Sequence, residues 1–168
     1  MLSVMFKKQS VILKRGGVVS KKISPNTKKL PDHHFKVVKV KKGLKDLGLF
    51  AGEHIKKGEH IIEYIGNILN KEESDKATTN EYLFEITRNK TIDGSVSWNV
   101  ARYCNHACEE RANAESDIVK GRVFIKAIRD IMEGEEIVYD YGEEFYKEHI
   151  QPIGCRCNAQ KHALCDAR

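Results

Sequence analysis

The sequence has no long apolar run. No stretch of its 168 residues approaches the roughly 18 to 20 apolar residues that a membrane-spanning helix needs. The most apolar pieces near the N-terminus, residues 2–6 and 11–13, are too short for the core of a secretory signal peptide. No internal repeat is visible. We therefore expect a soluble intracellular protein with one modest hydrophobic core, a tail and no membrane partner.

Acidic residues are almost missing from the first 45 positions. Residues 1–45 hold 13 Lys and Arg and one acid, Asp32, whereas residues 46–168 hold 16 basic and 23 acidic residues. The acidic body favours a basic partner, and the basic segment favours nucleic acid. A flexible, solvated arm over 1–34 explains the same composition, and the start of the chain also faintly resembles a transit peptide, although its single Arg15 argues against that.

Cysteines are few and concentrated towards the C-terminus. Three of the five lie in the last fourteen residues. In the absence of a secretory signal, the Cys155-x-Cys157 pair indicates metal ligation in a reducing compartment rather than disulfides.

Short, mostly apolar stretches separated by turn residues predict strands. These stretches are residues 35–40, 48–51, 60–64, 82–86, 91–93, 123–128 and 137–139. Asn70 and Glu73 resemble a capping box, which predicts a helix over 71–77, and residues 98–103 suit one helical turn. The expected fold class is mostly β with short helices.

Three groups of polar side chains follow one another in the second half of the chain. Asn105 and His106 come first, the tyrosine doublet Tyr139 and Tyr141 comes about thirty residues later, and the terminal cysteines follow. This order resembles a SET-domain protein-lysine methyltransferase.

The resemblance extends over about three quarters of the chain. It places a SET domain at about 35–142 and a post-SET cysteine segment at about 150–167. Further matching segments are residues 47–51, 58–59, 63–66, 99–102 and 134–136, together with Tyr82. The resemblance implies a knot-like fold of small β-sheets that brings the Asn-His pair and the tyrosines together.

The resemblance also implies S-adenosylmethionine as the methyl donor. The donor-binding residues that it assigns are Gly48, Leu49, Phe50, Tyr82, Arg102, Asn105, His106 and Tyr141. The glycine segment and His106 would act through their backbone, and the side chain of Asn105 offers donors and acceptors for the amino-acid end of the donor.

Methyl transfer to an amine requires alignment and desolvation more than acid-base strength. Free lysine titrates at about 10.4, and a dry aromatic channel beside a sulfonium favours its neutral, nucleophilic form. By resemblance the catalytic residues are Tyr141, which positions methyl and amine, Tyr139 and the channel residue Tyr82. A hydroxyl on Tyr139 leaves less room for added methyl groups, which predicts mono- or dimethylation.

The family's zinc site maps onto Cys108, Cys155, Cys157 and Cys165. Four thiolates suit a structural Zn²⁺. The usual spacing after Cys157 falls on His162, which is the alternative to Cys165. Cys104 is left over and is expected to be a small buried hydrophobe.

Two segments depart from the family pattern. Asp46 stands where a glycine is frequent, and the loop after Cys108, residues 109–113, is longer by two residues and lacks a proline. Asn113 is expected to fill the role of the family's asparagine. A cysteine-rich pre-SET segment is absent.

The leading hypothesis is therefore S-adenosylmethionine-dependent methylation of a lysine in a basic tail such as that of a histone, in the nucleus of a eukaryote or the cytoplasm of a prokaryote. One alternative is methylation of a non-histone basic protein. Another is a catalytically silent SET-like module whose basic residues 1–45 bind nucleic acid.

Overall fold

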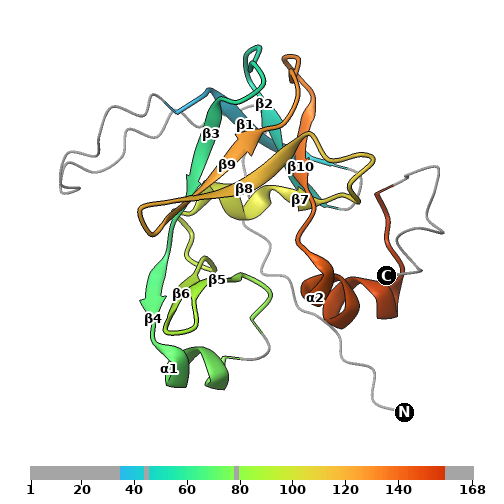
Figure 1. The fold of residues 1–168 in the computed structure, drawn as a ribbon. Helices are drawn as coiled ribbons and strands as arrows, with labels where there is room; N and C mark the ends of the chain where they lie inside the picture. The colour runs from blue at the N-terminus through green and yellow to red at the C-terminus, as the bar shows by residue number, and fades with distance from the viewer. Residues whose placement is uncertain (1–34, 44–45, 78–79, 158–168) are drawn as a thin grey trace.

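The computed structural model describes residues 35–43, 46–77 and 80–157 (Figure 1). The expected arm over 1–34 lies outside the described residues. Strands dominate the described part, in agreement with the expected fold class. They are β1 Val38–Lys42, β2 Leu47–Ala51, β3 His60–Tyr64, β4 Asn67–Leu69, β5 Leu83–Thr87, β6 Lys90–Asp93, β7 Asn105–His106, β8 Ala114–Val119, β9 Arg122–Ala127 and β10 Glu136–Tyr139.

The larger sheet places β10 at its centre. The strand order is β1-β2-β10-β8-β9-β3, and β7 also pairs with β10. β10 is antiparallel to β2 but parallel to β7 and β8. In the β7 pairing, Val138 is the partner of Asn105 and Tyr139 is the partner of His106. The two motifs that lie far apart in the sequence therefore run side by side (Figure 1).

Side-chain alternation explains the position of β10. Ile137 and Tyr139 are buried, whereas Glu136 and Val138 are half-buried, which is the period of two expected for a strand. Ile137 joins a core whose largest fully buried side chains include Phe124, Leu49 and Ile125. The strand thus carries its tyrosine on the core-facing side.

A smaller sheet in the order β4-β6-β5 lies below the larger one in Figure 1. Helix α1 (Lys71–Lys76) follows β4 and begins at Asn70, whose side chain accepts a hydrogen bond from the Glu73 backbone while the Glu73 side chain accepts from the Asn70 backbone. The predicted capping box is confirmed. Tyr82 lies immediately before β5, so this sheet carries the expected channel residue.

The chain after β10 forms three short helical turns. They are α2 Glu143–Phe145, the π-helical turn η2 Tyr146–Ile150 and the 3-10 turn η3 Gln151–Ile153. A fourth turn, η1 (Val100–Tyr103), precedes β7. Tyr146 and Ile150 pack with Ala107, Cys108 and Cys157 in a second hydrophobic cluster. No helix of the described residues is long and apolar enough to cross a membrane.

The first strand differs from the prediction. It spans Val38–Lys42 instead of residues 35–40. Pairing with β2 sets its limits, because Val38 is the partner of Ala51 and Lys42 is the partner of Leu47. Local apolarity at Phe35 therefore does not decide where the strand begins.

Candidate active site

Tyr141 lies two residues beyond the end of β10, within a cluster of rings. Its hydroxyl donates to the carbonyl oxygen of Cys104 at 2.7 Å. Its ring lies 4.8 Å from Tyr139, 5.3 Å from His106 and 4.9 Å from Phe145, measured between centroids. The phenol proton is thus directed to the backbone immediately before Asn105.

Burial raises the pKa of both Tyr139 and Tyr141 well above the ordinary tyrosine value. For Tyr141, repulsion between its phenolate and the ionised forms of Tyr139, Cys104, Tyr64 and Tyr82 acts in the same direction. Both phenols therefore stay protonated at physiological pH. They can donate and accept hydrogen bonds, but they do not act as anionic bases.

Tyr82 makes one contact with the larger sheet and one with the turn η1. The Tyr64 hydroxyl donates to the Tyr82 carbonyl oxygen at 2.8 Å, and the guanidinium of Arg102 lies over the Tyr82 ring at 4.4 Å from its centroid. Arg102 also donates from Nη1 to the Ser95 carbonyl. Its Nε is buried and has no hydrogen-bond partner within the described residues. Tyr82 and Arg102 therefore form one unit.

Asn105 connects β7 to the glycine segment. Its Nδ2 donates to the Leu47 carbonyl at 3.2 Å and to Glu136 Oε1 at 2.8 Å. A Cβ on Gly48 would collide with Glu136 Oε1 and lie 3.2 Å from Asn105 Nδ2. A side chain at position 48 would therefore displace the Glu136 carboxylate that accepts from Asn105.

Asn113 bonds to β10 from the lengthened loop. Its Nδ2 donates to the Glu136 carbonyl at 2.8 Å, and its Oδ1 accepts from the Val138 N–H at 2.9 Å. The side chain is almost fully buried. Asn113 thus bonds β10 to the loop that connects β7 with β8.

A pocket opens beside Asn105. Residues of β7 and β10, of the 109–113 loop and of the C-terminal segment line it, together with two charged residues that precede β10; these are Asn105, His106, Ala107, Arg111, Asn113, Arg129, Glu135, Glu136, Val138, Arg156 and Cys157. The other predicted donor-binding residues do not line this pocket; these are Gly48, Leu49, Phe50, Tyr82, Arg102 and Tyr141. Asn105 joins the two groups, because it contacts Leu47 on one side and lines the pocket on the other.

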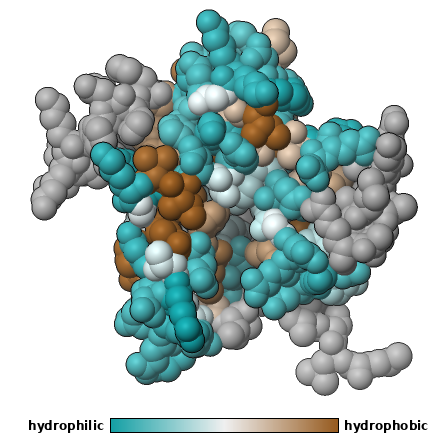
Figure 2. Space-filling model, in the orientation of Figure 1, coloured by the Kyte–Doolittle hydropathy of each residue, from teal (hydrophilic) through white to brown (hydrophobic). Residues whose placement is uncertain are grey.

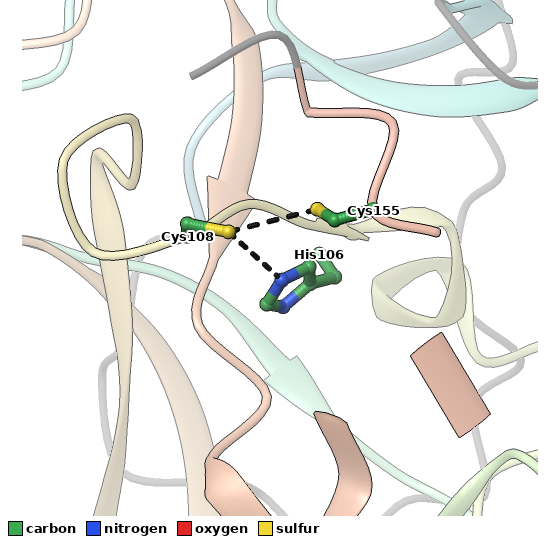
Figure 3. Close-up of side chains that lie close together, drawn as sticks. All are labelled: His106, Cys108 and Cys155. Carbon is green, nitrogen blue, oxygen red and sulfur yellow. Dashed lines mark hydrogen bonds between the residues drawn. The ribbon is translucent and has the colours of Figure 1, made fainter. Parts of the chain in front are cut away.

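Two of the predicted zinc ligands lie together (Figure 3). The sulfurs of Cys108 and Cys155 are 3.6 Å apart, and His106 Nε2 is 3.7 Å from Cys108 Sγ. All three ligand atoms lie within 4.8 Å of one another. Two thiolates on a tetrahedral Zn²⁺ with bonds of about 2.3 Å would be about 3.8 Å apart, so the spacing of the two sulfurs fits zinc when both are reduced, whereas Cys108 is disulfide-bonded in this structure.

Of the remaining predicted zinc ligands, only Cys157 lies among the described residues. Cys157 is buried in the same hydrophobic cluster as Cys108, but its sulfur is not among the three ligand atoms that lie within 4.8 Å of one another. Cys165 and His162 lie outside the described residues. Cys104 is buried and its thiol donates to the Ile137 carbonyl at 3.2 Å, as expected for a residue that takes no part in ligation.

The side chain of His106 has a position that the sequence reasoning missed. Its Nδ1 accepts from the Tyr141 N–H at 3.3 Å, while Nε2 faces Cys108. The spacing of His106 and Cys108 could have predicted this position, because the side chains of residues two apart on an extended segment point to the same side. His106 therefore lies between the tyrosines and the thiols.

The fold and the site define a small β domain in which an Asn-His strand, the buried Tyr139, the half-buried Tyr141 and a cysteine cluster lie in one region. Residues 46–142 match the SET domain. Because this match covers more than half of the chain, the chain belongs to the SET-domain family.

Curated relatives carry the same domain. The Schizosaccharomyces pombe histone-lysine N-methyltransferase, H3 lysine-4 specific, is 38% identical over 123 residues, covering 67% of this chain and 13% of that protein. The Arabidopsis thaliana histone-lysine N-methyltransferase ASHH3 is 34% identical over 146 residues, covering 78% of this chain and 40% of that protein. The chain thus spans less than half the length of these relatives.

Two solved structures are similar to this chain in fold and in sequence. Polycomb repressive complex 2 of Chaetomium thermophilum matches with a TM-score of 0.59 and 32% identity, covering 66% of this chain and 16% of that chain. A structure of ctPRC2 bound to S-adenosylmethionine matches with a TM-score of 0.55 and 30% identity, covering 64% of this chain and 15% of that chain.

Proposed function

We propose that this protein is an S-adenosylmethionine-dependent protein-lysine N-methyltransferase. The observation that carries the proposal is the hydrogen bond from the half-buried Tyr141 side chain to the carbonyl of Cys104, the residue directly before Asn105. It connects the residue assigned to the lysine with the backbone directly before Asn105, the residue assigned to the donor. Membership of a family whose relatives are histone-lysine methyltransferases supports the same activity.

Donor binding is assigned to the region around Asn105. The polar groups there include the Asn105 amide, the Glu136 carboxylate and the Leu47 carbonyl next to Gly48. The side chains of Arg111, Arg129, Glu135 and Arg156 also line the pocket. Such groups suit a methionine moiety that carries an ammonium and a carboxylate. The related ctPRC2 chain binds S-adenosylmethionine, which supports the same donor here.

The lysine side is assigned to the tyrosines. A neutral phenol at Tyr141 that donates to Cys104 keeps its lone pairs for an incoming amine or methyl group. The Tyr139 hydroxyl makes no hydrogen bond within the described residues, so it can form one with a water molecule or with the substrate amine. These groups would align the in-line displacement and exclude bulk water. The lysine ammonium would release its proton to solvent before it enters the site, and the neutral amine would then take the methyl group as the bond from carbon to the donor sulfur breaks and S-adenosylhomocysteine leaves.

Zinc is assigned to Cys108 and Cys155, with Cys157 and either Cys165 or His162 as further predicted ligands. His106 would act as a hydrogen-bond donor to the Cys108 sulfur, because its Nδ1 accepts from the Tyr141 N–H and Nε2 therefore carries the ring proton. A bound Zn²⁺ would supply a structural cross-link between β7 and the C-terminal segment. The post-SET segment, expected at 150–167, is thereby proposed to stay beside the donor pocket.

The proposed substrate is a lysine in a basic tail, with histones as the first candidates because the relatives are named for them. The acidic excess after residue 45 favours encounter with such a tail. A nuclear, chromatin-associated location follows for a eukaryotic source. The proposed products are mono- and dimethyl-lysine.

Transfer of a labelled methyl group tests the proposal. The protein would be incubated with labelled S-adenosylmethionine and, separately, with histones, with non-histone basic proteins and with an acidic control protein. We expect label on a basic protein and none on the acidic one. Label only on non-histone proteins would reject the histone assignment while keeping the activity.

A binding measurement separates the enzyme from a silent module. Calorimetry with S-adenosylmethionine should show a saturable site of one donor per chain. No transfer to any substrate combined with no donor binding would favour a scaffold that binds nucleic acid through residues 1–45. Retention of duplex DNA on the protein, measured in parallel, would support that alternative.

A further inference from the structure

Two β-hairpins, one from each sheet, touch at their tips. The β5–β6 hairpin of the small sheet turns at residues 88–89, directly before Lys90. The β8–β9 hairpin of the larger sheet turns at Lys120 and Gly121. Lys90 Nζ donates to the Gly121 carbonyl oxygen at 2.9 Å. A charge-assisted hydrogen bond therefore links the two sheets at this point.

The shape of the β8–β9 turn suits this contact. Lys120 and Gly121 have φ values of 50° and 72°, and two positive φ values in a two-residue hairpin loop are typical of a type I′ turn. A Cβ on Gly121 would lie 3.4 Å from Lys90 Nζ. Glycine at this position thus serves both the turn and the close approach of the ammonium group.

The neighbouring charges leave the Gly121 carbonyl as the acceptor for Lys90. The guanidinium of Arg122 makes two hydrogen bonds of 2.7 Å to the Glu63 carboxylate, so these two charges neutralise each other. Lys120 is exposed, whereas Lys90 is half-buried. Lys90 makes no ion pair and no other hydrogen bond within the described residues.

The opposite end of the same hairpin carries Tyr82. There the Tyr64 hydroxyl donates to the Tyr82 carbonyl and the Arg102 guanidinium lies over the Tyr82 ring, while Ile92 of β6 packs in the main core. The tip lies roughly 15 Å along the strand from Tyr82, at about 3.3 Å per residue. Without the bond from Lys90, the tip would be free to move about the end that carries Tyr82.

The two sides of the expected lysine channel belong to different sheets. Tyr82 directly precedes β5 of the small sheet, whereas Tyr141 follows β10 of the larger sheet. Repulsion from ionised Tyr82 contributes to the raised pKa of Tyr141, so the two phenols lie within range of each other. A change in the orientation of the β5–β6 hairpin therefore changes the spacing across the channel.

We propose that Lys90 is a positioning residue for the lysine channel, because its bond to the Gly121 carbonyl sets the orientation of the β5–β6 hairpin and thereby the spacing between Tyr82 and Tyr141. The inference rests on the proposed function, since it takes Tyr82 as one wall of the channel that receives the substrate lysine. It adds a residue outside the channel that determines how well the channel accepts a peptide.

Three variants separate the tip contact from a general effect of charge. Lys90→Met removes the ammonium group and keeps a long side chain, whereas Lys90→Arg keeps a cationic donor. Arg88→Met is the matched control. Arg88 is exposed at the same tip and makes no hydrogen bond or ion pair within the described residues, so its replacement removes the same charge without touching Gly121.

Steady-state methylation at saturating S-adenosylmethionine measures KM and kcat, with a histone H3 peptide or the basic protein labelled in the transfer assay as substrate. A substrate that binds only the oriented hairpin loses apparent affinity in proportion to the fraction of that form. Loss of a hydrogen bond to a charged group shifts such an equilibrium by about tenfold, so we expect the KM of Lys90→Met for the substrate to rise about fivefold. Its kcat should stay within about twofold of the wild-type value, because saturating substrate selects the oriented form.

Relaxation-dispersion NMR of the backbone amides of β5 and β6 tests the orientation without a substrate. We expect exchange broadening on the microsecond-to-millisecond timescale in Lys90→Met and none in the wild-type protein or in Arg88→Met. Lys90→Arg should have a KM within about twofold of the wild-type value, because it restores a charged donor. The KM of Arg88→Met should equal that of the wild-type protein.

An unchanged KM in Lys90→Met would overturn the proposal, and so would an equal rise in Arg88→Met or a Lys90→Arg variant as impaired as Lys90→Met. A lower kcat at unchanged KM, together with a lower melting temperature, would assign Lys90 a merely structural role. A wild-type protein that methylates no basic protein would reject the proposed function. Absence of exchange broadening in Lys90→Met would reject the positioning role alone.

Discussion

The Tyr141 hydroxyl makes one hydrogen bond within the described residues, to the Cys104 carbonyl. Tyr141→Phe removes this group and leaves the ring contacts with Tyr139, His106 and Phe145 in place. We expect the rate of methyl transfer to fall by about 100-fold or more, the scale seen when one oriented hydrogen-bonding group is removed from an active site. Single-turnover kinetics would measure it.

Donor binding is the control for this variant. S-adenosylmethionine affinity should stay within about threefold of the wild-type value, because the Asn105 contacts are untouched. Survival of most of the activity in Tyr141→Phe would contradict the catalytic assignment.

Tyr139→Phe tests the number of methyl groups added. The Tyr139 side chain is buried, and its hydroxyl makes no hydrogen bond within the described residues, so Phe fits without breaking a contact. Loss of the hydroxyl gives room for a methylated amine, and the product should shift from mono- and dimethyl towards trimethyl-lysine. Mass spectrometry of the product peptide measures the distribution, and an unchanged distribution would reject this role for Tyr139.

At the residue scale, the sequence predicts which residues belong to the candidate site better than it predicts how their side chains are oriented. Asn105 and Tyr141 could be singled out because short motifs carry them. The Glu136 contact with Asn105 could not, because it depends on β10 lying against both β2 and β7. Likewise, the place of the His106 ring between Tyr141 and Cys108 follows from the chain after β10 turning back over β7.

At the scale of elements, strands with apolar alternation were predictable. β3 spans His60–Tyr64 as expected, and α1 begins at its predicted cap. β8 was missed because its Ala, Glu, Ser and Asp residues have low strand propensity and half of its six positions are exposed. Its pairing with β9 along its whole length, from Ala114 with Ala127 to Val119 with Arg122, compensates for that composition.

The C-terminal turns provide a prediction about metal. Purified protein should contain about one Zn²⁺ per chain, and Cys108→Ser or Cys155→Ser should lower that content by more than half, because each removes a thiolate ligand. A chelator should also lower the melting temperature by several degrees, since ligand binding to the folded state contributes folding free energy. Elemental analysis and a thermal melt measure the two effects.

Cys104→Ala is the matched control. Its thiol donates to the Ile137 carbonyl in the main core, so the zinc content should not change. A full zinc complement in both Cys108→Ser and Cys155→Ser would contradict the assignment of the metal site.

At the scale of the whole molecule, the buried phenols predict loss of stability in alkali. Burial raises the pKa of Tyr64, Tyr139 and Tyr141 above the ordinary value. Above a pH of about 10 the unfolded chain loses these protons while the folded chain keeps them. The folded state then binds more protons, so the free energy of unfolding falls by about 1.4 kcal/mol per group and pH unit.

Urea denaturation between about pH 9 and 11 measures this slope. Tyr139→Phe removes one of the groups and should make the decline shallower. A free energy of unfolding that stays level across this range in the wild-type protein would show that the phenols ionise as easily in the folded state as in the unfolded chain.

The charge distribution also acts at this scale. The described surface is largely hydrophilic, with apolar side chains gathered in a few small areas on the face shown in Figure 2. The acidic excess lies after residue 45, and the basic excess lies before it. The composition could predict this asymmetry, but the target lysine depends on groove contacts that no motif encodes.

The most direct test of the account is the mass of the product. Histone H3 and H4 peptides incubated with the protein and S-adenosylmethionine should gain one or two methyl groups on a lysine side chain, located by fragmentation. The same reaction with Tyr141→Phe should leave the peptides unchanged. Methylation of a residue other than lysine, or undiminished lysine methylation by Tyr141→Phe, would contradict the claim that this tyrosine-lined site is a lysine methyltransferase centre.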